Sequence, residues 1–221
     1  CEAHGDLLHL ASAVNNRAML SACLGDKPKM MSDLERVITL GRHLGQDAIQ
    51  IAGHYNMGEY LYLWGDIDIA MPHAERALQL EMLRTANSPR VELELLPARL
   101  ALHRGALATA RDVVASIRAR KRTATPAPAI DVLCTMVEYA SREVNDAAWE
   151  ALEARSAQFS IGQERIEVIE ARAVSALRHG RYDESRHHFV RAIDAAHAIP
   201  NVMRERLQRW MVELAERARG E

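Results

Sequence analysis

Apolar residues recur along this chain at spacings of three and four residues, with polar residues between them and short breaks that contain glycine or proline. This spacing places the apolar side chains on one face of an α-helix, and each break ends one helix before the next begins. Strand-forming stretches are sparse in the 221 residues, so the pattern predicts an all-α fold. The expected helices are residues 6–24, 28–44, 47–64, 67–84, 89–104, 106–121, 127–142, 146–157, 161–179, 182–197 and 201–218.

The glycines that separate these helices recur at a fixed interval. Gly25, Gly65 and Gly105 are each 40 residues apart (65 − 25 and 105 − 65), and a further copy of the pattern is centred on Gly180. Small or apolar residues stand at matching positions around each glycine, which is the signature of an internal repeat. The small residues seven positions before the glycines are Ala18, Gly58, Ala98 and Ala173. One more unit, less regular, fits between Gly105 and Gly180.

The last expected helix, 201–218, is apolar along one face and charged elsewhere, as a helix that caps a repeat stack should be. Its apolar positions are Val202, Leu207, Trp210, Met211 and Leu214. We therefore expect a single domain, residues 1–221, built as an α-solenoid of about five helical hairpins and a C-terminal capping helix. The proline-containing stretch at 122–128 is the clearest linker, and it marks a bend or a boundary between two parts of the stack.

The composition of the chain argues against nucleic acid and membranes as partners. The 28 basic residues nearly balance the 30 acidic ones, so no global field attracts nucleic acid or a membrane surface. No run approaches the roughly 18 apolar residues that a membrane helix needs. Cys1, Cys23 and Cys134 are widely spaced, which indicates reduced thiols in a cytoplasmic protein. Because the sequence opens on Cys1 and not on methionine, we expect it to be a piece of a longer protein.

The repeated columns resemble the tetratricopeptide repeat, in which W-x2-L-G-x2-Y is followed by A-x3-F and a later proline. In the second unit the matching residues are Asn56, Met57, Gly58, Leu61, Ala70, Ala74 and Ala77, preceded by His54. In the fifth they are Ile169, Arg172, Ala173, Ala176, Ser185, Phe189 and Ala192. The tryptophan is absent and the period is longer than the family's. This long form resembles the repeats of large bacterial transcription activators and multidomain kinases, which implies a sensory or protein-docking arm.

In this architecture the first helix of each unit lines the concave, binding face. One stripe recurs there at offsets of four and seven residues, and these side chains share a helix face. Its members are Asn15, Met19 and Ala22; Tyr55, Glu59 and Tyr62; Leu95, Arg99 and Leu102, with His103 beside the third set. Asn15, Met19, Tyr55, Glu59, Tyr62, Arg99 and His103 are the candidate partner-binding residues. The alternative is that the tyrosines and leucines of the stripe pack against the next helix.

Other clusters favour ordinary structural roles. Arg118, Arg120, Lys121 and Arg122 end a helix, where basic side chains match the helix dipole, so nucleic-acid binding is not expected. The histidines and cysteines lack ligand spacing, so no metal site or other cofactor is expected. Glu164, Glu167 and Glu170 lie along one helix face, which we interpret as a solvated ridge; their alternative is a pair of catalytic carboxylates.

The sequence thus predicts a non-catalytic scaffold that binds protein or peptide, as an arm of a larger bacterial regulatory protein. A sensor of a small ligand or signal peptide is the alternative within the binding class. An enzyme built on the glutamate ridge is the alternative outside it.

Overall fold

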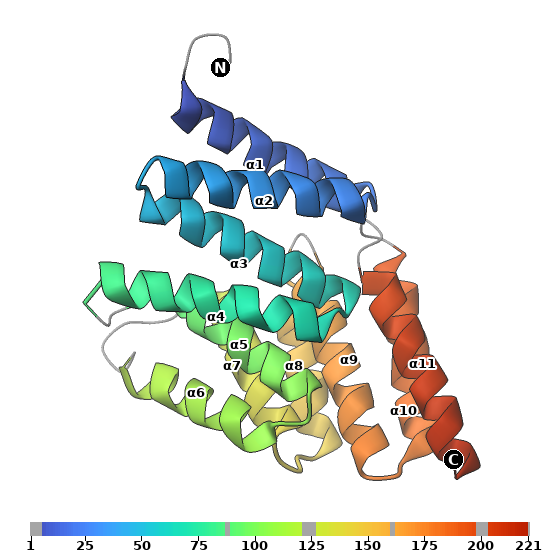
Figure 1. Cartoon of the computed structure of the whole chain (residues 1–221). Helices are drawn as coiled ribbons and strands as arrows, with labels where there is room; N and C mark the ends of the chain where they lie inside the picture. Colours follow the sequence, from blue (N-terminus) through green and yellow to red (C-terminus); the bar gives the residue numbers. More distant parts are fainter. Residues whose placement is uncertain (1–5, 87–88, 121–126, 160–161, 198–202, 221) are drawn as a thin grey trace. The chain divides into compact units, whose positions relative to one another are not determined.

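A computed structural model describes residues 6–86, 89–120, 127–159, 162–197 and 203–220 (Figure 1). These residues form eleven α-helices and no strand, which confirms the all-α fold for that part of the chain. The helices are α1 Leu7–Cys23, α2 Lys27–His43, α3 Asp47–Trp64, α4 Ile67–Arg84, α5 Val91–His103, α6 Leu107–Arg120, α7 Pro128–Ala140, α8 Asp146–Ser156, α9 Gln163–Arg178, α10 Tyr182–Ala196 and α11 Arg204–Arg219. Every expected helix is present, and α5 continues through Pro97.

The chain divides into two compact units, residues 1–100 and residues 101–221. The expected bend at 122–128 falls mostly on residues outside the described part of the chain, so it stays a prediction.

The glycines of the repeat pattern lie at helix ends, as expected. Gly65 has φ +83°, and its backbone N–H reaches back to carbonyl oxygens in the last turn of α3. Only glycine adopts this left-handed conformation without steric cost, which is why the pattern marks helix ends. Asp26, which follows Gly25, caps the next helix: its carboxylate accepts a bond of 3.1 Å from the Lys29 backbone N–H.

In the first unit, α1, α2 and α3 each pack on the next helix in the chain, and α1 also packs on α3. A close approach of α3 and α4 occurs at Gly58, where an added Cβ would lie 3.1 Å from the Ala74 backbone nitrogen and 3.3 Å from the Ala70 carbonyl oxygen of α4. Ala18 and Ala98, in the same column of the repeat, are fully buried. The small-residue column therefore marks positions of dense helix packing.

In the second unit, each helix from α6 to α11 packs on the next, and α9 packs in addition on α7 and on α11. Ala173 is fully buried in α9, as its place in the small-residue column predicts. Leu207 and Leu214 of α11 are buried, whereas most of its other side chains are charged and exposed. The face expected for the closing helix is thus confirmed at those two leucines, while Val202 lies outside the described residues.

Replacing Gly58 by leucine is expected to lower the free energy of unfolding by about 1–3 kcal/mol, because the side chain has no room between α3 and α4. Gly58→Ala should change it much less. Its methyl group forces a small shift of the α4 backbone, which offsets the helix preference of alanine. Urea denaturation of the two variants and of Ala13→Leu, at an exposed position on α1, measures this. An unchanged stability for Gly58→Leu would contradict the close approach of the helices.

Candidate functional site

Two asparagines join the first helices of the first two hairpins. The Asn56 Nδ2 amide of α3 donates to Asn15 Oδ1 of α1 over 2.8 Å, and both side chains are partly exposed. Met19, one turn along α1, is 47% exposed, whereas Ala22 is fully buried. Asn15 and Met19 therefore lie where a partner could reach them, and the asparagine bond sets how α1 and α3 align.

A second contact joins α3 to α5 around a buried guanidinium group. Arg99 of α5 donates to both carboxylate oxygens of Glu59, with the Nη1 bonds at 3.0 and 3.1 Å. Its guanidinium carbon lies 4.4 Å from the centre of the Tyr62 ring, a cation–π geometry. Tyr62 is only 1% exposed and Arg99 3%. Tyr62 therefore belongs to the packing between helices, as the alternative interpretation had it for the tyrosines and leucines. Arg99, which that alternative did not include, is buried beside it and also presents no surface.

A hollow of about 280 Å³ opens beside Tyr55. It is lined by Ala52, Tyr55 and Asn56 of α3 and by Arg90, Glu92 and Leu93 at the start of α5. Tyr55 is partly buried and packs against the apolar cluster that contains Ile51 and Leu93. Burial, and then the neighbouring Glu59 carboxylate, raise the pKa of the Tyr55 hydroxyl, so the phenol stays protonated as a hydrogen-bond donor. The sequence had singled out Tyr55 but not Arg90 or Glu92.

The remaining candidate, His103, belongs to the second unit. It is partly exposed, and its ring centre lies 5.8 Å from that of Trp210 in α11. His103 therefore packs with α11 in its own unit.

We expected the glutamate ridge of α9 to be solvated. That expectation is wrong, because two of its three glutamates are buried. Glu167 and Glu170 are each 1% exposed. Arg206 of α11 donates to Glu170 over 2.9 Å from Nε and 2.5 Å from Nη2, and the Trp210 indole N–H donates over 3.0 Å. Burial raises the pKa of Glu170 and the adjacent Arg206 charge opposes that rise. Because Glu170 is already bonded by three donors, its geometry is that of an anchor between α9 and α11.

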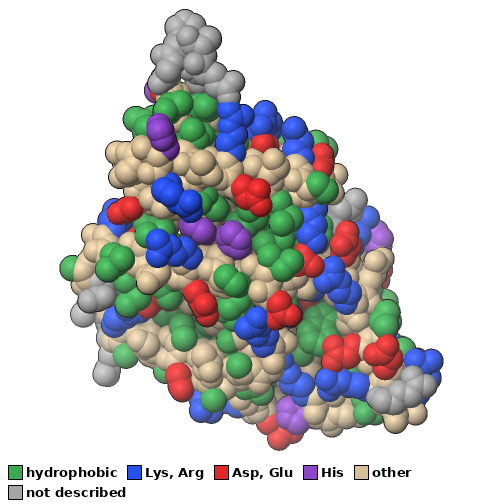
Figure 2. Space-filling view, viewed as in Figure 1, with side chains coloured by type: hydrophobic (Ala, Val, Ile, Leu, Met, Phe, Trp, Pro, Cys, Tyr) green, Lys and Arg blue, Asp and Glu red, His purple; other side chains and the backbone are tan. Residues whose placement is uncertain are grey.

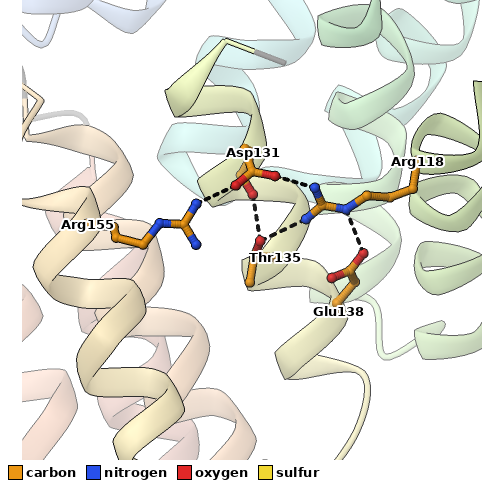
Figure 3. A network of polar contacts seen from close by, with 5 residues as sticks. All are labelled: Arg118, Asp131, Thr135, Glu138 and Arg155. Carbon is orange, nitrogen blue, oxygen red and sulfur yellow. Dashed lines mark hydrogen bonds and ion pairs between the residues drawn. The ribbon is translucent and has the colours of Figure 1, made fainter. Parts of the chain in front are cut away.

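A further polar network joins α6, α7 and α8 (Figure 3). Arg118 donates to Glu138 over 2.9 Å, to Thr135 over 2.8 Å, and to Asp131, which also accepts from Arg155 of α8. Burial tends to raise the pKa of Asp131, but its bonds to the two arginines outweigh this and lower it. Arg118 is therefore used within the fold. Lys121 and Arg122 of the same basic cluster lie outside the described residues.

Histidines pair in the first unit. Nδ1 of His54 in α3 lies 3.0 Å from Nδ1 of His73 in α4, so one ring donates and the other accepts. Among the described residues, no group of three or more His, Cys, Asp and Glu side chains is placed to hold a metal ion. On the face shown in Figure 2, basic and acidic side chains are interspersed among hydrophobic ones.

No protein-family model matches the chain, and neither does any curated protein or solved structure. Within the described ranges, no helix has both the length and the apolar character needed to cross a membrane.

Arg206→Met is expected to destabilise the protein by about 3–5 kcal/mol, because it leaves the Glu170 carboxylate buried without its counter-charge. Adding Glu170→Gln should recover part of that loss, since a neutral amide costs less to bury. Arg209→Met, at an exposed position of the same helix, should change stability by less than about 1 kcal/mol. Chemical denaturation of the three variants tests this; a loss as small as that of Arg209→Met would contradict the anchor.

The first unit should lose stability as the pH falls from about 6.5 towards 4. Burial, and then the charges of His73, Arg76 and Arg42, lower the pKa of His54 from 6.5 to about 4 in the folded state. Between these values the unfolded chain binds a proton that the folded chain does not, so the stability present above pH 6.5 is lost on acidification.

His54→Gln should flatten this part of the stability–pH curve, whereas His43→Gln, at an exposed position of α2, should not. Urea denaturation across this range, on the wild type and both variants, measures the slopes. Equal slopes for the wild type and His54→Gln would contradict the buried, neutral state of His54.

Proposed function

We propose that this chain is a non-catalytic scaffold, a tetratricopeptide-like solenoid, whose α1, α3 and α5 surface within residues 1–100 binds an extended peptide of a partner protein. The packing of α1, α2 and α3 each on the next helix, with α1 also on α3, supports a stack of helical hairpins. By the resemblance of its repeats, the chain would serve as a docking arm of a larger bacterial regulatory protein. The observation that carries the proposal is the hollow beside Tyr55, next to the paired asparagines.

The asparagine pair offers what a peptide backbone needs. Each amide side chain has donors and an acceptor, and the bond between Asn56 and Asn15 uses one of each. This leaves the Asn15 amide nitrogen as a donor and the Asn56 carbonyl oxygen as an acceptor. A peptide unit of an extended chain presents one C=O and one N–H, so it complements this pair.

The hollow offers a place for one side chain of that peptide. Tyr55 and Leu93 supply apolar wall, and Arg90 and Glu92 supply charge of both signs at its edge. Tyrosine gives large contact area at low entropic cost, which suits an interface anchor. The exposed Met19 extends the apolar surface along α1. Backbone recognition by the asparagines and side-chain recognition by the hollow together define an extended-peptide site.

The proposal is tested with peptides selected from a random display library against the whole protein, followed by affinity measurements. Met19→Ala and Asn56→Ala should each weaken a selected peptide by about 1–3 kcal/mol, because each removes a contact on the proposed face. Met82→Ala, a partly exposed methionine of α4, is the matched control and should leave the affinity unchanged. Equal affinities for the Met19 and Met82 variants, together with normal binding by Asn56→Ala, would overturn the proposal.

Tyr62→Ala separates packing from binding in the same experiment. Since Tyr62 is buried under Arg99, its truncation should cost stability by about 3 kcal/mol or more. At a temperature where the variant is still folded, the peptide affinity should remain close to that of the wild type.

A further inference from the structure

The second unit contains a larger hollow, of about 610 Å³, that the proposed peptide site does not use. It is lined by side chains of α8, α9 and α10 and by Ala157 after α8. Nine of its eleven lining residues carry titratable groups, and the other two are alanines. A hollow so rich in charge suits a small, highly polar ligand.

The inner end of the hollow, where Arg172 and His188 are buried, is rich in hydrogen-bond donors. Arg172 of α9 is 8% exposed, and His188 of α10 is 4% exposed. Arg172 uses Nη2 on Asp146 over 2.9 Å, while its Nε has no partner in the structure. Arg191 Nη1 lies 3.3 Å from His188 Nδ1. Because a guanidinium group only donates, His188 Nδ1 is the acceptor and Nε2 carries the hydrogen.

That Nε2–H group is not satisfied by its neighbours. The closest carboxylate oxygen, Oε1 of Glu184, is 4.0 Å away, which is beyond hydrogen-bonding distance. Burial, and then the charges of Arg172 and Arg191, lower the pKa of His188 to about 4, so the ring is neutral near pH 7. The Nε2–H of His188 is thus an unused donor in a hollow that the guanidinium groups of Arg172 and Arg191 also line, and this combination suits a carboxylate.

The acidic residues divide into paired and unpaired members. Glu153 is buried and paired with Arg191, and Asp146 is paired with Arg172. Glu150, also on α8, is exposed and forms no ion pair with any described residue. Its carboxylate is therefore available to a positive group of the ligand.

We propose that this hollow binds a small zwitterion, with its carboxylate at Arg172, Arg191 and His188 and its ammonium group at Glu150. A multiply charged anion such as phosphate is disfavoured because four carboxylates line the hollow. A simple cation is disfavoured because three arginines line it too. An amino acid carries both charges and matches both sets of groups.

The probes are glycine, β-alanine, γ-aminobutyrate and ε-aminocaproate, a series in which the two charges are progressively further apart. Caproate and hexylamine are the matched probes that keep the chain of ε-aminocaproate and lose one charge each, and inorganic phosphate represents a simple anion. Binding to the whole chain is measured by calorimetry and by ligand-detected NMR. At least one amino acid of the series should bind about tenfold more tightly than caproate, as expected for one charge-assisted hydrogen bond.

Glu150→Gln should remove this advantage and leave caproate binding unchanged, because Glu150 contacts only the ammonium group. Glu143→Gln, at an exposed position before α8 and outside the hollow, is the matched control and should bind all probes as the wild type does. Arg191→Gln should weaken the amino acid and caproate alike, with circular dichroism confirming that the variant is folded.

Three results would overturn the proposal. The first is no binding by any amino acid of the series, and the second is an equal effect of Glu150→Gln and Glu143→Gln. The third is tighter binding of phosphate than of every amino acid, which would make the hollow a site for simple anions. None of these results bears on the peptide site, because that site lies in residues 1–100 and is tested by Met19 and Asn56.

Discussion

The constraint on which this fold depends is the close approach of α3 and α4. Gly58 lies so near the α4 backbone that a methyl group would be 3.1 Å from the Ala74 nitrogen, and Ala70 and Ala74 of α4 are themselves almost fully buried. At such a distance dispersion contacts involve the backbones themselves, and any larger side chain separates the helices. Ala18, Ala98 and Ala173 are the small residues at the corresponding position of the other repeats.

Close packing fixes how near the helices come, but polar contacts at one repeat interval fix how they align. The Asn15–Asn56 bond spans 41 residues, the Glu59–Arg99 contact 40, and the Glu170–Arg206 contact 36. Each joins a helix to the second helix after it in the chain. A buried ion pair gains little net stability over apolar packing, because desolvation offsets the attraction, so we infer that these pairs act by selecting one alignment. We infer that these contacts align α1 with α3, α3 with α5 and α9 with α11.

The difference between local features and contacts across the chain explains which parts of the structure the sequence could predict. Helix bounds depend on local features, such as the left-handed Gly65 and the capping Asp26, and these are legible in the sequence. The environment of the glutamates on α9 is not local. Glu164, Glu167 and Glu170 have the spacing of a solvated ridge, and only the arrival of Arg206 from 36 residues away makes Glu170 a buried anchor. A search for opposite charges one period apart would have found Glu59 and Arg99, because they occupy the same column of neighbouring repeats.

The same contacts decide which part of the predicted face remains for a partner. Tyr62 and Arg99 are buried between α3 and α5. The part of the predicted face that remains accessible is therefore Asn15, Met19 and the hollow at Tyr55. What remains there is not a uniform apolar groove. In the proposed site, the asparagine bond leaves one donor and one acceptor for a peptide backbone, whose C=O and N–H groups are the same in almost every sequence. Discrimination between peptides must then come from the hollow, where Arg90 and Glu92 flank an apolar wall. The selectivity of the proposed site therefore depends on the residues at the start of α5 more than on the tyrosine stripe that first indicated it.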